Sequence, residues 1–595
     1  TVPRVLGPEE ELLVPVTVFA MEEGIKDVSL ELSSTGKIEL IDRSKKVSFS
    51  KTGQQTVYFK AKVKRALGKG SLKITAKSGA EKSFEETEIA VRSPLRRQKQ
   101  FHDAILEDSN PVSYKAEPFG IAGSNKLTVE VSSLPKMNLS ERLEYLIGYP
   151  HGCLEQTTSK CFAQLNLDKW IKLDANQKAE IQSNIQAGLS KLRTLQLGEG
   201  GFRYWPGQNF ANAWASTYVG HFMLSAEKAG YKLPVGMKDS YLRFARKAAR
   251  EWNNNNHYSY NNDFNQAYRL YVLALAGRPE LGAMTRLKNR NDLTRSAAFR
   301  LAAAYALVGE KEAARALLQA HDYTEAEDRY YYYCYGSATR RLAMQMETFY
   351  AMGDKEEALR LAKEIADKMS DGWHSTQTIA YTLQAMSQVF GGGTEKMDFE
   401  LVVNGKTRLI SSDLSVFQYE AATFEKAQDI SVKSLNGQAL YLTVMREGLP
   451  VYGSETANSS RINMTVQYLD QSGNKLDPSA LKIGTPIIAK VTLQRLSLSK
   501  DYENLAVSQL FPSGWEITNN RVLAGGEDTQ SYFDYQDIRD DRVLTYYNGY
   551  HKPSMTIQIV LTATYPGKWY LPPTWVEAMY EGSVNANNVG QWVEV

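Results

Sequence analysis

Hydrophobic and polar positions follow two different periods along this chain, and the changes of period divide it into regions. From residue 12 to residue 92 apolar and polar side chains alternate, as at Val57, Phe59, Ala61 and Val63, with glycines between the runs. Short alternating runs separated by turn residues are typical of a β-sandwich. A second set of strand signals runs from residue 96 to residue 133.

From Asn138 to Phe390 the period becomes helical, and a polar start precedes the first apolar stripe. Eleven or twelve helical segments fit this region, joined by short turns that carry glycine or proline. Several are apolar on both long faces, for instance Ala297–Val308 and Ala338–Met352. Paired helices of this kind predict hairpins stacked into a bundle or a closed toroid, whose inner helices are fully buried.

Strand signals resume after Gly391-Gly392-Gly393, with hairpin turns at Asn404-Gly405 and Asn436-Gly437. The strands of 96–133 are too few to close a sandwich, so we expect 394–447 to supply the remainder. A last β block follows Gly448-Leu449-Pro450 and runs to Val595. The helical region is therefore predicted to be inserted between two segments of one β domain.

These patterns predict a multidomain α+β fold in which β-sandwich domains flank an all-α toroid of helical hairpins. The predicted sandwiches at the two ends comprise residues 1–95 and 449–595. The interrupted β domain comprises 96–135 and 392–448, and the toroid comprises 136–391.

Composition narrows the classes of function. The 595 residues are 43% hydrophobic and 23% charged, with a net charge of +3, which favours neither nucleic acid nor an anionic membrane. No apolar run approaches the roughly 20 residues of a membrane span. Three cysteines exclude a disulfide-rich scaffold. The chain begins at Thr1 rather than Met, so we expect a processed or truncated piece whose targeting signals lie upstream.

The chemistry concentrates at Cys153 and Gln156, three residues apart behind a turn at Pro150 and Gly152. Residues i and i+3 share a face of a helical turn, so the sulfur and the side-chain amide carbon can meet. A thiolate that displaces ammonia from the amide yields an internal thioester, a stored acylating group. The alternative is a small buried hydrophobic residue followed by a solvated glutamine.

The string Gly152-Cys153-Leu154-Glu155-Gln156-Thr157, after Tyr149-Pro150, resembles the thioester signature of the alpha-2-macroglobulin and complement family, most closely its bacterial members. The resemblance implies a macroglobulin-like domain at 1–95, a CUB-like domain at 96–135 and 392–448, and a helical thioester domain at 136–391. It also implies a C-terminal macroglobulin or receptor-binding-like domain at 449–595, whose closing residues resemble the native C terminus of bacterial members.

By this resemblance the chain is the C-terminal portion of a protease-trapping inhibitor, consumed in one reaction and so not an enzyme. Cleavage of a bait region in upstream macroglobulin domains would expose the bond, and a lysine or hydroxyl group of the target protease would take the acyl group of Gln156. No cofactor, metal or nucleic acid is implied. The expected location is the periplasm or cell envelope, with membrane anchoring through an upstream region.

Four further residues enter through the resemblance. Asn265 aligns with the histidine that complement-type relatives use to direct acylation to hydroxyls, and asparagine cannot form an acyl-imidazole, so direct attack by lysine is expected. His257, eight residues earlier, confounds that placement. Tyr149 is placed to fold over the thioester, and Met579 or Tyr580 to complete a hydrophobic lid.

Other candidate residues are given structural roles or left open. His151 is a turn residue or helps to deprotonate the thiol. The aromatic stretches 200–218 and 373–378 resemble the family more loosely, and we expect them to pack. Cys161 is expected to fill the core, and Cys334, in a run of tyrosines, receives no chemistry.

Two alternatives from other classes remain open at this point. A cysteine hydrolase would pair Cys153 with a distant histidine, His257 or His374. A carbohydrate-active toroid would need a carboxylate pair in its cavity, and Glu199, Asp263 and Asp371 are available outside any recognisable acid/base motif. The sequence contains no zinc His-Glu-x-x-His motif, phosphate loop or nucleophile elbow.

Overall fold

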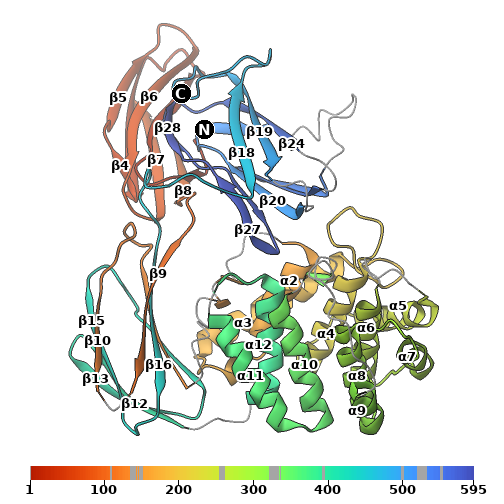
Figure 1. Ribbon diagram of the computed structural model, residues 1–595. Helices are drawn as coiled ribbons and strands as arrows, with labels where there is room; N and C mark the ends of the chain where they lie inside the picture. The colour runs from red at the N-terminus through yellow and green to blue at the C-terminus, as the bar shows by residue number, and fades with distance from the viewer. Residues whose placement is uncertain are drawn as a thin grey trace.

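The computed structural model describes the chain in segments, and all structural statements below concern these residues. They are 2–107, 110–133, 142–143, 145–146, 152–253, 262–319, 334–335, 337–370, 372–390, 396–496, 502–518, 533–549 and 554–595. Tyr149, His151, His257 and Asp371 lie outside them. Figure 1 shows β-sheet layers above and beside one helical region, so the predicted multidomain α+β class is confirmed.

The N-terminal region forms two five-stranded sheets whose apolar faces meet at Leu30, Leu32 and Phe59. The first has the order β1 (Val5–Leu6), β8 (Glu81–Val91), β7 (Gly68–Ser78), β3 (Asp27–Gly36), β5 (Ser44–Ser48). The second has the order β28 (Gln591–Glu594), β25 (Gly567–Leu571), β2 (Glu11–Ala20), β6 (Gly53–Val63), β4 (Ile38–Leu40). Two C-terminal strands, β25 and β28, thus complete an N-terminal sheet. The domain boundaries expected from the sequence stay predictions.

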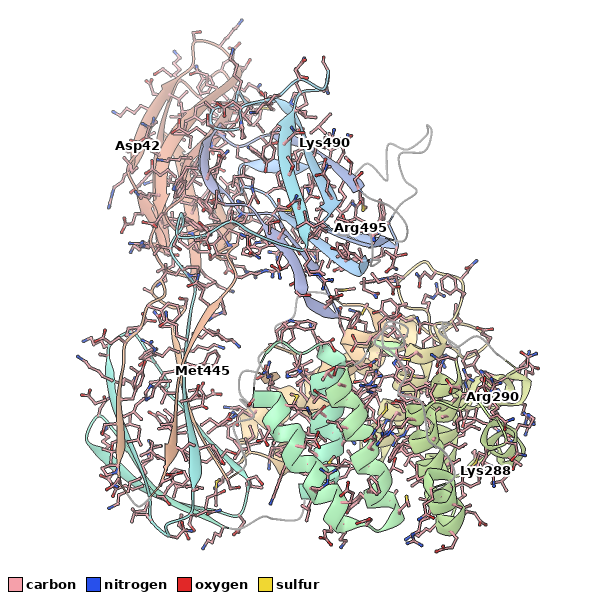
Figure 2. All side chains as sticks on the ribbon, viewed as in Figure 1. Asp42, Lys288, Arg290, Met445, Lys490 and Arg495 are labelled. Atoms are coloured by element: carbon pink, nitrogen blue, oxygen red, sulfur yellow. The ribbon has the colours of Figure 1, made fainter. Side chains whose placement is uncertain are left out.

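The C-terminal region adds a six-stranded and a four-stranded sheet. The six-stranded order is β17 (Asn458–Ser460), β27 (Glu581–Asn587), β26 (Trp575–Ala578), β20 (Tyr502–Leu510), β23 (Arg542–Gly549), β22 (Tyr535–Ile538). The four-stranded order is β18 (Ile462–Leu469), β19 (Pro486–Arg495), β24 (Ser554–Ala563), β21 (Trp515–Ile517). Lys490 and Arg495 mark β19 in Figure 2.

Strands from before and after the helices pair in two further four-stranded sheets. One has the order β10 (Val112–Ala116), β15 (Gln428–Ser434), β12 (Met397–Val403), β13 (Lys406–Ser412), and the other β14 (Val416–Glu420), β11 (Lys126–Ser132), β16 (Leu440–Gly448), β9 (Gln98–Leu106). Val112 lies opposite Val432 and Val129 opposite Val444. The helical region is therefore inserted within this β unit, where Figure 2 labels Met445.

Eleven α-helices lie between Leu154 and Phe390 in the described segments. The inner ones are α2 (Leu154–Gln164), α4 (Ala213–Lys228), α6 (Asp263–Leu275), α8 (Arg295–Leu307), α10 (Ala338–Met352) and α12 (Thr376–Phe390). The outer ones are α3 (Ala175–Thr194), α5 (Met237–Glu251), α7 (Leu281–Lys288), α9 (Lys311–Gln319) and α11 (Lys355–Ser370). A short 3₁₀ helix, Leu167–Lys169, follows α2.

Each inner helix packs on the next, and α12 packs back on α2, so the ring closes. Burial follows this arrangement: α6 is buried on all sides, whereas α5 buries one stripe, Met237, Tyr241, Ala245 and Ala249. Helices that are apolar all round belong inside, and amphipathic ones form the outer layer. The predicted toroid is thus present, and Lys288 and Arg290 mark its outer layer near α7 in Figure 2.

The turn between β26 and β27 approaches the toroid next to α2 (Figure 1). This brings residues near 580 against residues near 155, more than four hundred positions apart in the chain. No helix in the described ranges combines the length and apolar character that crossing a membrane requires.

Candidate functional site

Cys153 stands at the N-cap of α2 and shares a capping box with Gln156. The Gln156 backbone N–H donates to the Cys153 sulfur at 3.4 Å, and the Cys153 backbone N–H donates to the Gln156 side-chain carbonyl at 3.4 Å. Reciprocal bonds of this kind satisfy two of the free donors at a helix start and fix both side chains. The thiol and the carboxamide are thereby held together, and both are fully buried.

A loop between β26 and β27 covers this pair. The Gln156 amide nitrogen donates to the Met579 sulfur at 3.1 Å, and the Tyr580 hydroxyl lies 3.8 Å from the Cys153 sulfur. The backbone N–H of Met579 donates to the Asn504 carbonyl of β20 at 3.0 Å, which anchors the loop to the C-terminal sheet. Met579 is 1% exposed, so it seals the pair from water.

Tyr204 touches the thiol from a different loop. The Cys153 thiol donates to the Tyr204 hydroxyl at 3.3 Å, and the Leu154 N–H donates to the Tyr204 carbonyl at 3.1 Å. A turn at Gly200, with φ of 102°, sets up this loop; a Cβ there would meet the Ser240 carbonyl at 2.1 Å, so only glycine fits. The expectation that this stretch only packs was incomplete, because Tyr204 also contacts the Cys153 sulfur.

Tyr335 completes an aromatic wall. Its ring stacks on Tyr204 at 5.2 Å between centroids and tilts against Tyr580 at 4.9 Å. Tyr335 belongs to a run of tyrosines to which no chemistry was assigned from the sequence. That unusual run was the only feature of the sequence that could have pointed to Tyr335. The next residue of the Tyr204 loop, Trp205, has its ring tilted against that of Tyr546 of β23 at 4.2 Å between centroids, so the C-terminal sheet rests on this loop as well as on α2.

Glu155, which lies between Cys153 and Gln156 in the sequence, has a buried carboxylate. It accepts hydrogen bonds from the Tyr580 hydroxyl at 2.6 Å, the Thr376 hydroxyl at 3.0 Å and the Ser159 hydroxyl. Burial raises the pKa of Glu155 above its usual value, while these three donors and the charge of Arg340 oppose the rise. Reasoning from the sequence gave this residue no role, although it stands inside the motif.

The electrostatics keep the sulfur protonated. Burial, followed by the nearby Glu155 charge, raises the pKa of the Cys153 thiol to about 12, and hydrogen bonds from its neighbours only partly offset this. A thiol of this pKa is a poor nucleophile toward external substrates at neutral pH. In the described segments no three or more His, Cys, Asp or Glu side chains are grouped so that they could hold a metal ion.

Comparisons with known proteins show what this chain is similar to. The family model of the bacterial alpha-2-macroglobulin MG10 domain matches residues 462–582, which include Met579 and Tyr580. An alpha-2-macroglobulin of Xylella fastidiosa (strain Temecula1 / ATCC 700964) is 23% identical over 98% of this chain, and that of Escherichia coli K12 is 23% identical over 97%. The chain spans 37% of the length of each of these two relatives.

Solved structures show the same fold. Native Escherichia coli alpha-2-macroglobulin, in a crystal structure spanning domain MG7 to the C terminus, matches with a TM-score of 0.83 at 17% identity, covering 100% of this chain and 98% of that one. A Salmonella alpha-2-macroglobulin reacted with methylamine matches with a TM-score of 0.83 at 18% identity, covering 100% of this chain and 40% of that one.

This chain resembles the C-terminal part of a bacterial alpha-2-macroglobulin. The resemblance inferred from the residues around Cys153 is therefore confirmed. The matches reach over nearly the whole chain, from the N-terminal sheets to β28.

Within this alpha-2-macroglobulin-like chain, the structure brings together four of the six residues singled out from the sequence: Cys153, Gln156, Met579 and Tyr580. Tyr149 lies outside the described residues. Asn265 sits in the first turn of α6, buried, where its side-chain carbonyl accepts a hydrogen bond from Thr217 at 3.3 Å. It is not among the hydrogen-bond partners of Cys153 or Gln156 in the described part of the chain.

The residues of the two alternatives lie elsewhere. His374 has a ring nitrogen 3.1 Å from the Lys368 carbonyl, and no imidazole is among the partners of the Cys153 thiol within the residues described. Asp263 accepts from the backbone N–H groups of Phe264 and Thr294, a structural use of its carboxylate. Glu199 is exposed in the turn before Gly200. Cys161 is buried against Gly188, as expected of a core residue.

Proposed function

We propose that this chain is the C-terminal portion of a protease-trapping inhibitor of the bacterial alpha-2-macroglobulin type, which captures target proteases through an internal thioester between Cys153 and Gln156. One observation carries the proposal. The thiol and the carboxamide face each other in a capping box, fully buried, under Met579 and Tyr580 of a separate β region. A buried acylating bond under a removable cover is what a single-use trap needs.

The chemistry follows from the side chains. The Cys153 sulfur attacks the Gln156 amide carbon, a C–S bond forms, the C–N bond breaks and ammonia leaves. A lysine amine or a hydroxyl of the captured protease later displaces the sulfur, which leaves as the Cys153 thiol, and an amide or ester joins Gln156 to the protease. The chain is consumed by this reaction, so it acts as an inhibitor rather than as an enzyme.

Exposure of the bond would come from outside this chain. In the proposed protein, upstream macroglobulin domains carry a bait segment, and its cleavage moves the C-terminal sheet off α2. The contacts that must then break include Met579 on Gln156, Tyr580 on Glu155, and Trp205 on Tyr546. We place the protein in the periplasm or cell envelope, with any membrane anchor in the upstream part.

Asn265 bears on the choice of acceptor. It cannot form an acyl-imidazole, and its side chain is held by Thr217, so we expect lysine amines to attack the carbonyl directly. The Asn265→His variant is the matched test: if this position governs acceptor choice, transfer to glycerol hydroxyls rises relative to transfer to methylamine.

Intact mass and thiol titration of the native chain test the proposal. The native mass should be lower than the sequence mass by one ammonia, and methylamine should add at Gln156 and release one thiol. Methylamine treatment is compatible with this fold, because the methylamine-reacted Salmonella protein matches this chain with a TM-score of 0.83. Cys161→Ser, which alters a buried cysteine eight residues further along, is the control and should keep the reaction, whereas Cys153→Ser should abolish it.

A full sequence mass and a thiol free from the outset, with glutamine rather than glutamate at position 156, would contradict the proposal. The cysteine hydrolase alternative predicts repeated turnover by a free thiolate. The pKa of about 12 of the Cys153 thiol and its lack of an imidazole partner in the described segments give that alternative no support.

A further inference from the structure

A chain of hydrogen bonds connects the Cys153 thiol to a buried carboxylate. The thiol lies 3.3 Å from the Tyr204 oxygen, the two tyrosine oxygens of Tyr204 and Tyr580 lie 2.5 Å apart, and the Tyr580 oxygen lies 2.6 Å from Glu155 Oε2. All four groups are buried or half-buried. The path crosses from the toroid to the C-terminal β region and back.

The direction of this chain follows from counting hydrogens. A tyrosine hydroxyl carries one hydrogen. Tyr580 donates its hydrogen to Glu155, so at the contact between the tyrosines Tyr204 must donate. The Tyr204 oxygen is then free to accept from the thiol, and each bond points from Cys153 toward Glu155.

The carboxylate end of the path is arranged to accept a proton. Three hydroxyls, from Tyr580, Thr376 and Ser159, all donate to Glu155, which is the pattern that an ionised carboxylate requires. Arg340, fully buried, contributes a positive charge to this environment. Its guanidinium donates to the Cys334 carbonyl and to Gln377, which hold it in place.

The reacting carbonyl has its own donor. The Cys153 backbone N–H donates to the Gln156 side-chain oxygen at 3.4 Å, where negative charge develops when sulfur attacks the amide carbon. The amide nitrogen, which must leave, points to Met579, the neighbour of Tyr580 in the chain.

We propose that Glu155 is the base for formation of the thioester, acting on the Cys153 thiol through Tyr204 and Tyr580. The thiol proton passes along the two hydroxyls to Glu155 as the S–C bond forms. The proton returns to the amide nitrogen as the C–N bond breaks, and ammonia departs. One thiol and one amide thus give one thioester and one ammonia, with no other reactant.

In this scheme Tyr204 and Tyr580, whose hydroxyls both contact the reacting sulfur, are catalytic, and Glu155 acts through these hydroxyls. Tyr580 comes from the C-terminal sheet, so the bond forms only once that sheet has docked on α2. The same contact that shields the finished bond then also builds it, and the reactive group is not made in an uncovered chain. This inference rests on the proposed function.

Re-formation of the bond in the full chain provides the assay. Ammonia opens the thioester, restoring the Gln156 amide and the Cys153 thiol, and its removal lets the bond close again. Closure is followed as loss of free thiol and as loss of one ammonia in the intact mass. General base catalysis contributes about 10²- to 10⁴-fold, so Glu155→Gln and Tyr580→Phe should each slow closure at least ~100-fold.

Cys161→Ser is the matched control, because Cys161 is a buried residue of α2 that is not a hydrogen-bond partner of Cys153, Tyr204, Tyr580 or Glu155 in the described segments. We expect it to close within a few-fold of the wild-type rate. The double variant Glu155→Gln with Tyr580→Phe should be no slower than either single variant, since both interrupt one path. Tyr204→Phe keeps the ring and removes the hydroxyl that contacts the thiol. It interrupts the same path at a residue of the toroid, so it should also slow closure, and it replaces any other variant that folds poorly.

The pH profile separates a proton path from packing. Closure in the wild type should rise with pH as Glu155 ionises and level off above its pKa, whereas Glu155→Gln should lose this rise. The titratable and charged groups around Glu155 are Cys153, Tyr145, Tyr204, Tyr218, Arg340 and Tyr580.

Closure of Glu155→Gln and Tyr580→Phe at the rate of Cys161→Ser would overturn the proton path while leaving the thioester intact. A wild-type chain whose native mass shows no loss of ammonia, and which never closes, would instead contradict the proposed function itself.

Discussion

Replacement of Met579 by alanine tests whether the β26–β27 loop controls access to Gln156. Met579 is 1% exposed and its sulfur lies 3.1 Å from the Gln156 amide nitrogen. The substitution removes three buried heavy atoms without touching α2. It therefore weakens the cover and removes the sulfur that faces the Gln156 amide, while the Cys153 and Gln156 side chains themselves are unchanged.

The magnitude follows from the burial. Each buried methylene-sized group is worth about 0.8 kcal/mol, so the loss of three reduces the stability of the closed arrangement by about 2.4 kcal/mol. A tenfold change in an equilibrium corresponds to about 1.36 kcal/mol. If methylamine reaches the bond through open molecules, its uptake should rise roughly 50-fold.

The assay is the pseudo-first-order release of thiol at a fixed methylamine concentration, with intact mass to verify one addition per chain. Met555→Ala is the matched control, because Met555 lies at 8% exposure in β24, in the four-stranded C-terminal sheet and not in the loop over α2. It should lower the thermal stability of the C-terminal region while leaving the methylamine rate unchanged. Wild-type uptake by Met579→Ala, with normal thermal unfolding, would refute the role of Met579 as cover.

Three further outcomes are expected. A Cβ on Gly220 would lie 2.1 Å from the Tyr241 ring, so Gly220→Ala should destabilise the toroid by about 1–3 kcal/mol in chemical denaturation. Gly282→Ala in α7 is the contrast, because the nearest atom to its added Cβ is at 3.8 Å, and it should not destabilise the toroid. Burial, followed by the charge of Arg300, lowers the pKa of His221 to about 3. The imidazole therefore binds a proton more tightly in the unfolded chain, and the free energy of unfolding should fall as the pH drops below about 6.5. His221→Gln should remove part of this dependence of unfolding free energy on pH. Arg300 pairs with Glu347 at 2.9 Å in full burial, so Glu347→Ala should cost about 3–5 kcal/mol in thermal unfolding, and a value near zero would contradict the pairing.

Local pattern predicted much of the fold. Alternation marked the sandwiches, and helices apolar on both faces, such as α8 and α10, marked the inner ring. Both signals arise from how one element divides its surface between core and water, which a short stretch of sequence records. The joining of β25 and β28 to the sheet of β2 was not predicted, because strand partners far apart in the chain leave no local signature.

The candidate site divides in the same way. Cys153 and Gln156 are three residues apart, and the geometry of a single helical turn places them together. Met579 and Tyr580 were named through resemblance to a family, since nothing near residue 579 points to residue 153. Glu155 was visible in the motif, but its partners from α12 and the β26–β27 loop were not.

By itself, the sequence of this protein determined the identity and spacing of Cys153 and Gln156 and the alternation of β and helical regions. Only the tertiary structure decided that Tyr204 and Tyr580 meet between the thiol and Glu155, and that Met579 closes over the amide. The physical reason is the range of the interactions. A capping box needs one helical turn, whereas a buried hydrogen-bond path across two regions exists only after the closed ring and the docked sheet have brought distant residues within about 3 Å of each other.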